Sequence, residues 1–515
     1  NNYHQNYPTN MKAEEEFSPS LPGAIRDFVF DLHFAIRTSK DAEEVQRLYE
    51  VKCKEITDTY FAQSTWPDAK LIAHEVNNDE LFLALYKEMT IRHITVKLKP
   101  QLSDHLNSWA NYKKLFELLA VAKEDELLIT PQWIYDITQE FAYQFQGFCQ
   151  YRCQLGNLNH DAIKTLQNNR DAWNLSDVIN LLTKLIRIAG LKPSTTTTTN
   201  AFNPNSVIHQ FGYFAAIELA RIQCLMGDYA SSLTTLSHLR LQDRNELFMS
   251  LPICHFNVFY HIGVCNMMLR KFNEGLDVFS DIILYVLRIL KPGAATNFRT
   301  GVPAQLQRMV DKAMSLTAIL MTVNPSYRIE DQVKEAIENK YGDKIKRLQL
   351  GDRTSAIELF ESSCPKFISP LVPEYGSITT NMHLDVFNHQ SQIFIDEILQ
   401  YIPFLKLRSY LSMYASIDVS KLSRFSEMSE IDLICLLLSY KNKASTQSRL
   451  GQKVASNRSG NDLNFTIDGG VLMIDSLPGK HDQVIGRERY FQSGIRKHHE
   501  IQTQLKKTFT KLGLE

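Results

Sequence analysis

The sequence predicts a mainly α-helical protein: a solenoid of stacked helix pairs (TPR/HEAT-like), then a winged-helix module with a small β-hairpin, then a C-terminal helix. Three observations lead to this fold class. Apolar residues recur every three to four positions through most of the chain, which is typical of helices with one buried face. A helix–turn–helix pattern occurs twice in the middle of the chain. Near the C-terminus, a run of helices precedes two β-forming segments around a turn.

The composition is that of a soluble protein with more than one domain. The chain has 515 residues, of which 44% are apolar and 22% charged, so it can bury several cores. The formal net charge of -1 gives no overall field that would attract nucleic acid or an anionic membrane. The polar N-terminus lacks a signal-peptide core, and no apolar run is long enough to cross a bilayer. We therefore expect a soluble, cytoplasmic protein.

Changes in composition predict the domain boundaries. A Thr run predicts a linker, three closely spaced prolines predict an extended connector, and a stretch rich in Ser, Asn and Gly predicts a flexible insertion. The expected segments are a disordered tail (1–20), an N-terminal helical domain (21–190), a Thr-rich linker (191–206), a helical-repeat domain (207–362), a Pro-containing connector (363–386), a winged-helix module (387–480, with the insertion at 444–462) and a C-terminal partner-binding helix (481–515).

Helical periodicity is clearest in the N-terminal domain. Leu81, Leu85 and Met89 form one apolar stripe, and residues 133–151 place aromatic side chains at helical spacing. Such a pattern is more often a core than a cofactor site. Cys149 and Cys153 lie four residues apart, but no second pair or nearby His completes a zinc site. We expect core thiols, no metal and no cofactor.

The middle of the chain contains a two-fold repeat. Helices are predicted at 214–225 and 229–239 around one turn, and at 256–269 and 272–290 around the next. Tyr229 and Phe272, each directly after a turn, are 43 residues apart (272 − 229), close to the period of helical-repeat proteins. We expect each ring to pack between the helices of its own pair. An ordinary pair of helical hairpins is the alternative.

The winged-helix prediction comes from residues 405–474. Helices are expected at 405–414, 418–425 and 429–440, and Ser429 is a suitable N-cap for the third. Two β-forming segments, 465–467 and 471–474, then flank an Asp-Gly-Gly turn suited to positive φ. Three helices followed by a hairpin are typical of a winged helix.

The C-terminal helix is predicted to bind other protein subunits. Its apolar side chains fall on one face, which a small winged helix cannot cover completely, and basic residues flank that face. A helix packed only on its own domain is the alternative. The expected partner-binding residues are Phe491, Ile495, Ile501, Leu505, Phe509 and Leu512.

Sequence motifs for catalysis are missing. The chain has no P-loop, dinucleotide-binding glycine pattern, nucleophile elbow or His-Glu-x-x-His zinc motif, so we expect no enzymatic activity. The third helix of the winged-helix module begins with acidic residues, which is the wrong sign for a groove-reading helix. Weak RNA contact is assigned instead to a few cations at its end and in the insertion: Lys441, Lys443, Arg449, Lys453 and Arg458.

The order of parts, helical repeats running into a winged helix, resembles the PCI-type scaffold family found in the proteasome lid, the COP9 signalosome and eukaryotic translation initiation factor three. Short words in the chain are similar, in order, to the L-subunit family of that initiation factor. Examples are Trp-Pro-Asp-Ala (66–69), Asn-Asp-Glu-Leu-Phe-Leu (78–83), Tyr-Gln-Phe-Gln (143–146), Leu-Met-Gly-Asp-Tyr (225–229), Tyr-Gly-Asp-Lys (341–344) and Ser-Cys-Pro-Lys-Phe (363–367).

This resemblance implies a non-catalytic, cytoplasmic scaffold subunit of initiation factor three, which supports assembly on the small ribosomal subunit in translation initiation. It also implies neighbours among the helical-repeat subunits, E and K, and a place for the last helix in a bundle of terminal helices. Two alternatives stay open from the sequence: a scaffold subunit of a sister complex, and a winged-helix RNA-binding regulator.

Overall fold

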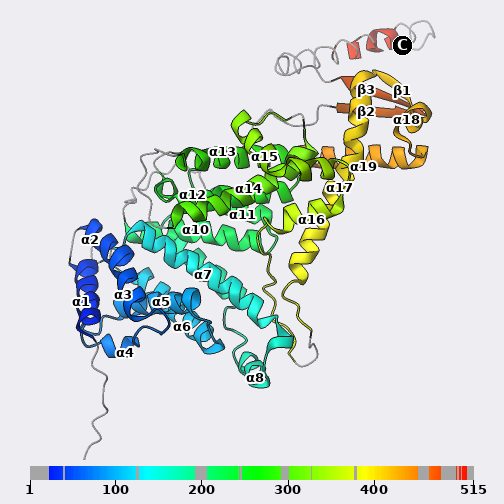
Figure 1. Cartoon of the computed structure of the whole chain (residues 1–515). Coiled ribbons are helices and arrows are strands. Elements are labelled where there is room, and N and C mark those ends of the chain that lie inside the picture. Colours follow the sequence, from blue (N-terminus) through cyan, green and yellow to red (C-terminus); the bar gives the residue numbers. More distant parts are fainter. Residues whose placement is uncertain are drawn as a thin grey trace, which may run out of the picture. The chain divides into compact units, whose positions relative to one another are not determined.

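The computed structural model describes residues 22–38, 41–122, 127–191, 206–241, 243, 246–291, 301–325, 327–375, 380–450, 463–476, 495, 498–499 and 501–506. The chain forms two compact units. The first unit comprises Asn1–His261 and Lys366–Asn388, and the second comprises Ile262–Pro365 and His389–Glu515. The predicted fold class is confirmed: the described residues are mainly helical, with one small sheet (Figure 1).

The first unit is a stack of helices. Its elements are α1 (Gly23–Arg37), α2 (Ala42–Arg47), the π-helical turn η1 (Leu48–Lys52), α3 (Cys53–Tyr60), α4 (Ala69–Ile72), α5 (Glu80–Lys97), α6 (Leu102–Val121), α7 (Pro131–Arg152), the short η3 (Leu155–Asn157), α8 (His160–Asn168), α9 (Leu175–Ile188), α10 (Val207–Leu225), α11 (Tyr229–Leu236) and η4 (Leu247–Ser250). The helix α12 (Pro252–Met268) begins in this unit.

Helix α7 is the centre of the first unit. It begins with Pro131, whose fixed φ suits the first helical position and whose missing N–H is no loss there. Most of its aromatic side chains are buried, among them Trp133, Phe141 and Phe148, as the sequence predicted for a core helix, whereas Tyr143 is exposed. Cys149 and Cys153 are also buried, as expected.

The proline-containing segment has no helix at 365–375 or 380–382, and residues 366–388 belong to the first unit. Ile368 donates its backbone N–H to Leu225 O (3.0 Å), and Met382 donates to Cys153 O (2.9 Å). Arg152 donates to Pro370 O. Arg152 therefore connects the end of α7 to a segment 218 residues away along the chain.

The second unit contains the remaining helices and the sheet. Its elements are the end of α12, then α13 (Phe272–Ile289), α14 (Val302–Val323), α15 (Asp331–Gln349), α16 (Arg353–Glu361), α17 (Asp385–Met413, whose first residues belong to the first unit), β1 (Ser416–Asp418), α18 (Val419–Ser426), α19 (Glu430–Leu450), β2 (Leu463–Asp468) and β3 (Val471–Ser476).

The four helices predicted for the repeat are present as α10, α11, α12 and α13. Both turns use a left-handed residue, Gly227 at φ 86° and Arg270 at φ 63°. Tyr229 and Phe272 are buried at the first position of the second helix of each pair. Each ring contacts an aromatic ring from later in the chain: Phe367 for Tyr229 and Tyr401 for Phe272.

The end of the second unit has the order of elements of a winged helix. Strand β3 lies between β1 and β2, and both pairings are antiparallel, with Ile417 and Ile467 opposite Leu472. The predicted turn is found at Gly469 (φ 55°) and Gly470 (φ 85°). One apolar core joins the three helices and the sheet: Phe404, Leu407, Leu411, Ile417, Val419, Leu422, Leu433, Leu437, Phe465, Leu472 and Ile474.

Three details differ from the sequence prediction. Strand β1 was not predicted, because three residues are too short for a periodic signal. Helix α19 continues to Leu450, so residues 444–450 of the predicted flexible insertion are helical, while 451–462 lie outside the described residues. Helix α17 is 29 residues long and includes Pro403, so the helix predicted at 405–414 begins well before residue 405.

Candidate functional site

The C-terminal helix is the predicted partner-binding site, and its described residues are helical and exposed. Residues 495, 498–499 and 501–506 are helical, and the Thr503 hydroxyl donates to His499 O four residues earlier (2.7 Å). Ile495, Ile501 and Leu505 are 68%, 53% and 51% exposed. Phe491, Phe509 and Leu512 lie outside the described residues. Half of the predicted residues are thus placed, all of them apolar and open to solvent.

A second apolar face lies on α19, the third of the helices that pack around the small sheet. Leu433 and Leu437 point into the core between these helices and the sheet, which turns the opposite side of α19 outward. There Ile431 is 74% exposed and Leu438 is 52% exposed, with the exposed Cys435 between them. The spacing of four and three residues puts the three on one stripe.

The polar residues around this stripe are acidic at its start. Ser429 caps α19 as predicted: its hydroxyl accepts from the Asp432 backbone N–H (3.1 Å) and donates to the Asp432 carboxylate (2.6 Å). Glu430 is exposed beside it. A negatively charged, apolar face does not complement the phosphates of a nucleic acid.

The predicted RNA-contacting lysines have partners inside the second unit. Lys441 Nζ donates to Phe465 O (2.7 Å), which ties α19 to β2. Lys443 Nζ donates to Gln400 Oε1 (2.6 Å) and lies 3.0 Å from a Glu397 carboxylate oxygen on α17. Of the remaining three, Lys453 and Arg458 lie outside the described residues, and Arg449 belongs to α19 with no described side chain.

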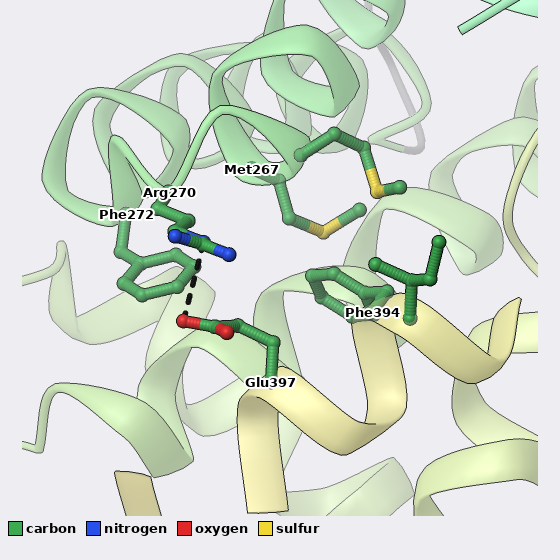
Figure 2. Close-up of a pocket in the computed structure, with 7 residues that line it drawn as sticks. Met267, Arg270, Phe272, Phe394 and Glu397 are labelled. Carbon is green, nitrogen blue, oxygen red and sulfur yellow. Dashed lines mark ion pairs between the residues drawn. The ribbon is translucent and has the colours of Figure 1, made fainter. Parts of the chain in front are cut away.

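Glu397 is a buried carboxylate that sequence reasoning did not single out. Its Oε1 lies 3.2 Å from Arg270 Nε and 3.0 Å from Lys443 Nζ, so it joins the α12–α13 turn to α17 and α19. Neither contact has hydrogen-bond geometry. Figure 2 shows the Arg270–Glu397 ion pair at the edge of a small cavity beside Phe272 and Phe394.

That cavity is too small for a ligand. It has a volume of about 40 Å³ and is bordered by Met267, Met268, Arg270, Phe272, Ile393, Phe394 and Glu397. Pockets for small molecules usually measure about 300–1,000 Å³. The space is therefore a gap in the packing around Glu397 rather than a binding site.

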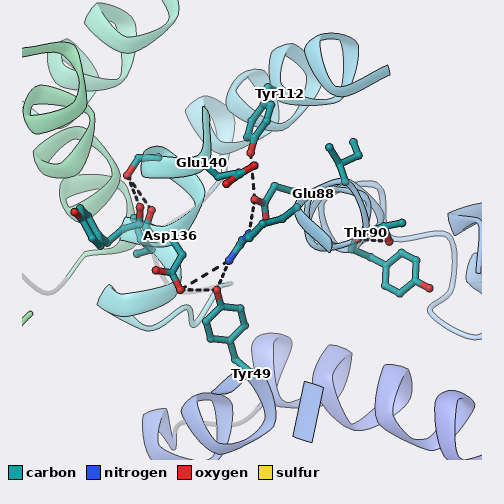
Figure 3. Close-up of polar contacts among 12 residues, drawn as sticks. Tyr49, Glu88, Thr90, Tyr112, Asp136 and Glu140 are labelled. Atoms are coloured by element: carbon teal, nitrogen blue, oxygen red, sulfur yellow. Dashed lines mark hydrogen bonds and ion pairs between the residues drawn. The ribbon is translucent and has the colours of Figure 1, made fainter. Parts of the chain in front are cut away.

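The first unit contains a cluster of titratable groups that resembles an active site only in composition (Figure 3). Arg92 donates to both carboxylate oxygens of the fully buried Glu88, and Tyr112 donates to Glu88 Oε1 (3.2 Å). Tyr49 donates to Asp136 (2.7 Å) and accepts from Arg92. Glu88 and Arg92 stand four residues apart on α5, a spacing visible in the sequence that would have identified the pair.

The pKa shifts in this cluster favour fixed charges. Burial, reinforced by the nearby carboxylates, raises the pKa of Tyr49 and of Tyr112 well above the ordinary value, so both stay neutral donors. Burial alone would lower the pKa of Arg92, but Glu88, Tyr49 and Asp136 raise it. Groups that hold one protonation state are suited to structure rather than to proton transfer.

A second buried ion pair, between Glu218 and Arg221, lies within α10, and Arg221 also contacts α7. Arg221 contacts the Glu218 carboxylate (3.3 Å) and donates to Gln146 Oε1 (3.3 Å), and its guanidinium lies over the Tyr143 ring. Burial outweighs the charge of Arg221 and raises the pKa of Glu218 to about 7. Burial, together with Arg221, lowers the pKa of His261 to about 3.

Within the described ranges, no three or more His, Cys, Asp or Glu side chains gather in a way that could hold a metal ion. In the same part of the chain, every helix is too short or too polar to span a lipid bilayer.

Comparison with known proteins identifies the family. The family model described as RNA polymerase I-associated factor PAF67 matches residues 104–497. Proteins named eukaryotic translation initiation factor 3 subunit L are similar over 91% of this chain: that of Danio rerio is 32% identical with 82% of its length covered, and that of Homo sapiens 32% with 83% covered. The Mus musculus protein of the same name is 31% identical, with 83% covered. The chain therefore belongs to the family of eukaryotic translation initiation factor 3 subunit L.

Proposed function

We propose that this translation initiation factor 3 component is a non-catalytic, cytoplasmic scaffold that joins its complex through the C-terminal helix. The observation that carries this role is the exposure of Ile495, Ile501 and Leu505, each at a helical position of the C-terminal segment. Burying one such side chain is worth about 1.5–3 kcal/mol, so a partner helix that covers all three gains substantial affinity. The buried ion pairs of the first unit, Glu88–Arg92 and Glu218–Arg221, support a structural role for that unit.

Family membership suggests who the partners are. The proposed partners are other subunits of initiation factor 3, with E and K as neighbours, and the terminal helices of sister subunits as the ligand of residues 491–512. Through that complex the chain would support assembly on the small ribosomal subunit. Direct RNA binding is not part of the proposal, because Lys441 and Lys443 are engaged within the second unit.

The test is a double substitution, Ile501→Asp with Leu505→Asp, in the full-length chain. Two buried carboxylates in place of two apolar contacts should weaken partner binding at least a hundredfold. Co-precipitation of initiation factor subunits from cells that express the tagged variant measures this loss. Circular dichroism of the purified variant should match the unchanged protein.

The matched control is His499→Asp with Thr503→Asp, which adds the same charge on the side of the helix opposite Ile501 and Leu505. It should still recover the partner subunits. If the Ile501/Leu505 variant enters the complex normally, the helix is not the binding site. If that variant loses its helical signal and melts early, the helix belongs to the core of its own unit, and the proposed role is also rejected.

A further inference from the structure

The structure has two exposed apolar stripes in the second unit, and their chemistry is complementary. One is the α19 stripe of Ile431, Cys435 and Leu438, and the other is formed by Ile501 and Leu505 of the C-terminal helix. Monomeric proteins rarely leave contiguous apolar surfaces open unless something binds them. The α19 stripe is therefore a suitable docking surface.

We propose that, in the free subunit, the C-terminal helix docks on the α19 stripe of the same chain, so that each apolar surface shields the other until partner subunits bind. This inference rests on the proposed partner-binding role of the C-terminal helix and adds a regulation to it. The docked helix is a latch that partner helices must displace.

Charge supports this occupant. The α19 stripe starts beside the exposed acidic residues Glu430 and Asp432. The sequence 495–507 carries four Lys or Arg and two His but a single Glu. Near the other end of the stripe, the charge of Lys443 is compensated by Glu397. Lys441 keeps its positive charge, but its Nζ is bound to Phe465 O. An acidic, apolar surface thus meets a basic, apolar helix.

Chain length makes the same-chain contact feasible. Strand β3 ends at Ser476, and 18 residues (477–494) separate it from Ile495. A chain of that length can reach up to about 60 Å, whereas α19 is only about 30 Å long. A tethered helix has an effective concentration in the millimolar range, which favours it over a second copy at ordinary protein concentrations.

The native thiol of Cys435 allows a direct test. It is the exposed cysteine among those described; Cys53 is half-buried and the others are buried. In the purified full-length chain, Leu505→Cys places a second thiol on the apolar stripe, and Thr503→Cys places one on the opposite side of the same helix. Mild oxidation followed by non-reducing electrophoresis and peptide mass spectrometry then detects disulfides between Cys435 and the introduced thiol.

If the helix docks as proposed, the Leu505→Cys chain forms an intramolecular disulfide at least tenfold faster than the Thr503→Cys chain, at a rate independent of protein concentration. Cys435→Ser abolishes the product. Equal rates for the two positions, or no disulfide, overturn the proposal. A covalent dimer whose yield rises with concentration also overturns it, and assigns the stripe to a second copy.

The regulatory consequence is measured separately, with the same Leu505→Cys protein before and after oxidation. The oxidised form should capture at least tenfold less of the partner subunits than the reduced form, and reduction should restore capture. Equal capture would show that the latch does not control binding. Because the disulfide assay uses the free chain alone, its failure leaves the partner-binding role standing, and the Asp variants test that role independently.

Discussion

Each unit contains a buried glutamate that forms ion pairs, Glu88 in the first and Glu397 in the second, and the two ion-pair sites differ in solvent exposure. Glu88 in the first unit is fully buried and receives hydrogen bonds from Arg92 and from the Tyr112 hydroxyl. Glu397 in the second unit meets Arg270, which is 44% exposed, at ion-pair distance without hydrogen-bond geometry. The Glu88–Arg92 ion pair is therefore largely excluded from water, whereas Arg270 of the Glu397–Arg270 pair is accessible to it.

The difference has an energetic meaning. A sealed pair costs much when one partner is removed, since the other charge stays buried, whereas a pair near water is weakened by ions and replaced by hydration. Glu88 therefore fixes the packing of α5, α6 and α7, while Glu397 links α17 and α19 to the end of the repeat more loosely. We expect the first unit to be stiff at its centre and the second to respond to salt.

The largest effect should follow Glu88→Ala. Arg92 would lose its main partner in a buried site, and the free energy of unfolding of the first unit should fall by about 3–5 kcal/mol. All four tryptophans, Trp66, Trp109, Trp133 and Trp173, lie in that unit, so urea unfolding followed by tryptophan fluorescence reports on it selectively.

Glu80→Ala is the control for that prediction, because Glu80 lies on the same helix and makes an exposed pair with Lys114. It should cost less than about 1 kcal/mol. A double variant, Glu88→Ala with Arg92→Met, should recover part of the stability. Equal small losses for Glu88→Ala and Glu80→Ala would contradict the idea of a sealed pair.

A somewhat smaller effect is expected from pH at Glu218. Its folded pKa of about 7 is raised from an ordinary value of 4.5, so between these values the folded state holds a proton that the unfolded chain has lost. Stability should therefore fall as pH rises from about 4.5 to about 7, by up to about 3 kcal/mol, and level off above. Tryptophan-monitored unfolding of the unchanged chain and of Glu218→Gln measures this. The Gln variant should lose that part of the pH dependence; identical curves would show that Glu218 titrates normally.

The smallest effect should come from Glu397→Gln. The amide keeps the shape but removes the charge that attracts Arg270 and Lys443, so the loss should be about 1 kcal/mol and should shrink further in roughly 1 M salt. Hydrogen exchange of peptides from α17 and α19 measures it, and the tryptophan transition should not move. Asp396→Asn, next to it in an exposed pair with Arg353, is the matched control. A salt-independent loss above about 3 kcal/mol would place Glu397 in the same class as Glu88.

Much of this fold follows from local signals. The repeat helices, the N-cap at Ser429 and the turn at Gly469 and Gly470 were predicted from residue type and spacing alone. Strand β1 was missed, because its identity as a strand depends on Ile417 pairing with Leu472, 55 residues later (472 − 417). The end of α19 was also missed, since polar residues on an exposed helical extension have no periodic apolar pattern.

What the sequence determined by itself is the set of local structures and the apolar stripes, because helix periodicity, caps and positive-φ turns depend on neighbours within a few residues. Only the tertiary structure decided which lysine side chains already have a partner within the protein. Lys441 and Lys443 look like surface cations in the sequence, yet one bonds to β2 and the other to α17. It also decided that Ile501 and Leu505 are exposed while the equally apolar Leu433 and Leu437 are buried. Burial depends on which distant segments meet, and no local pattern contains that information.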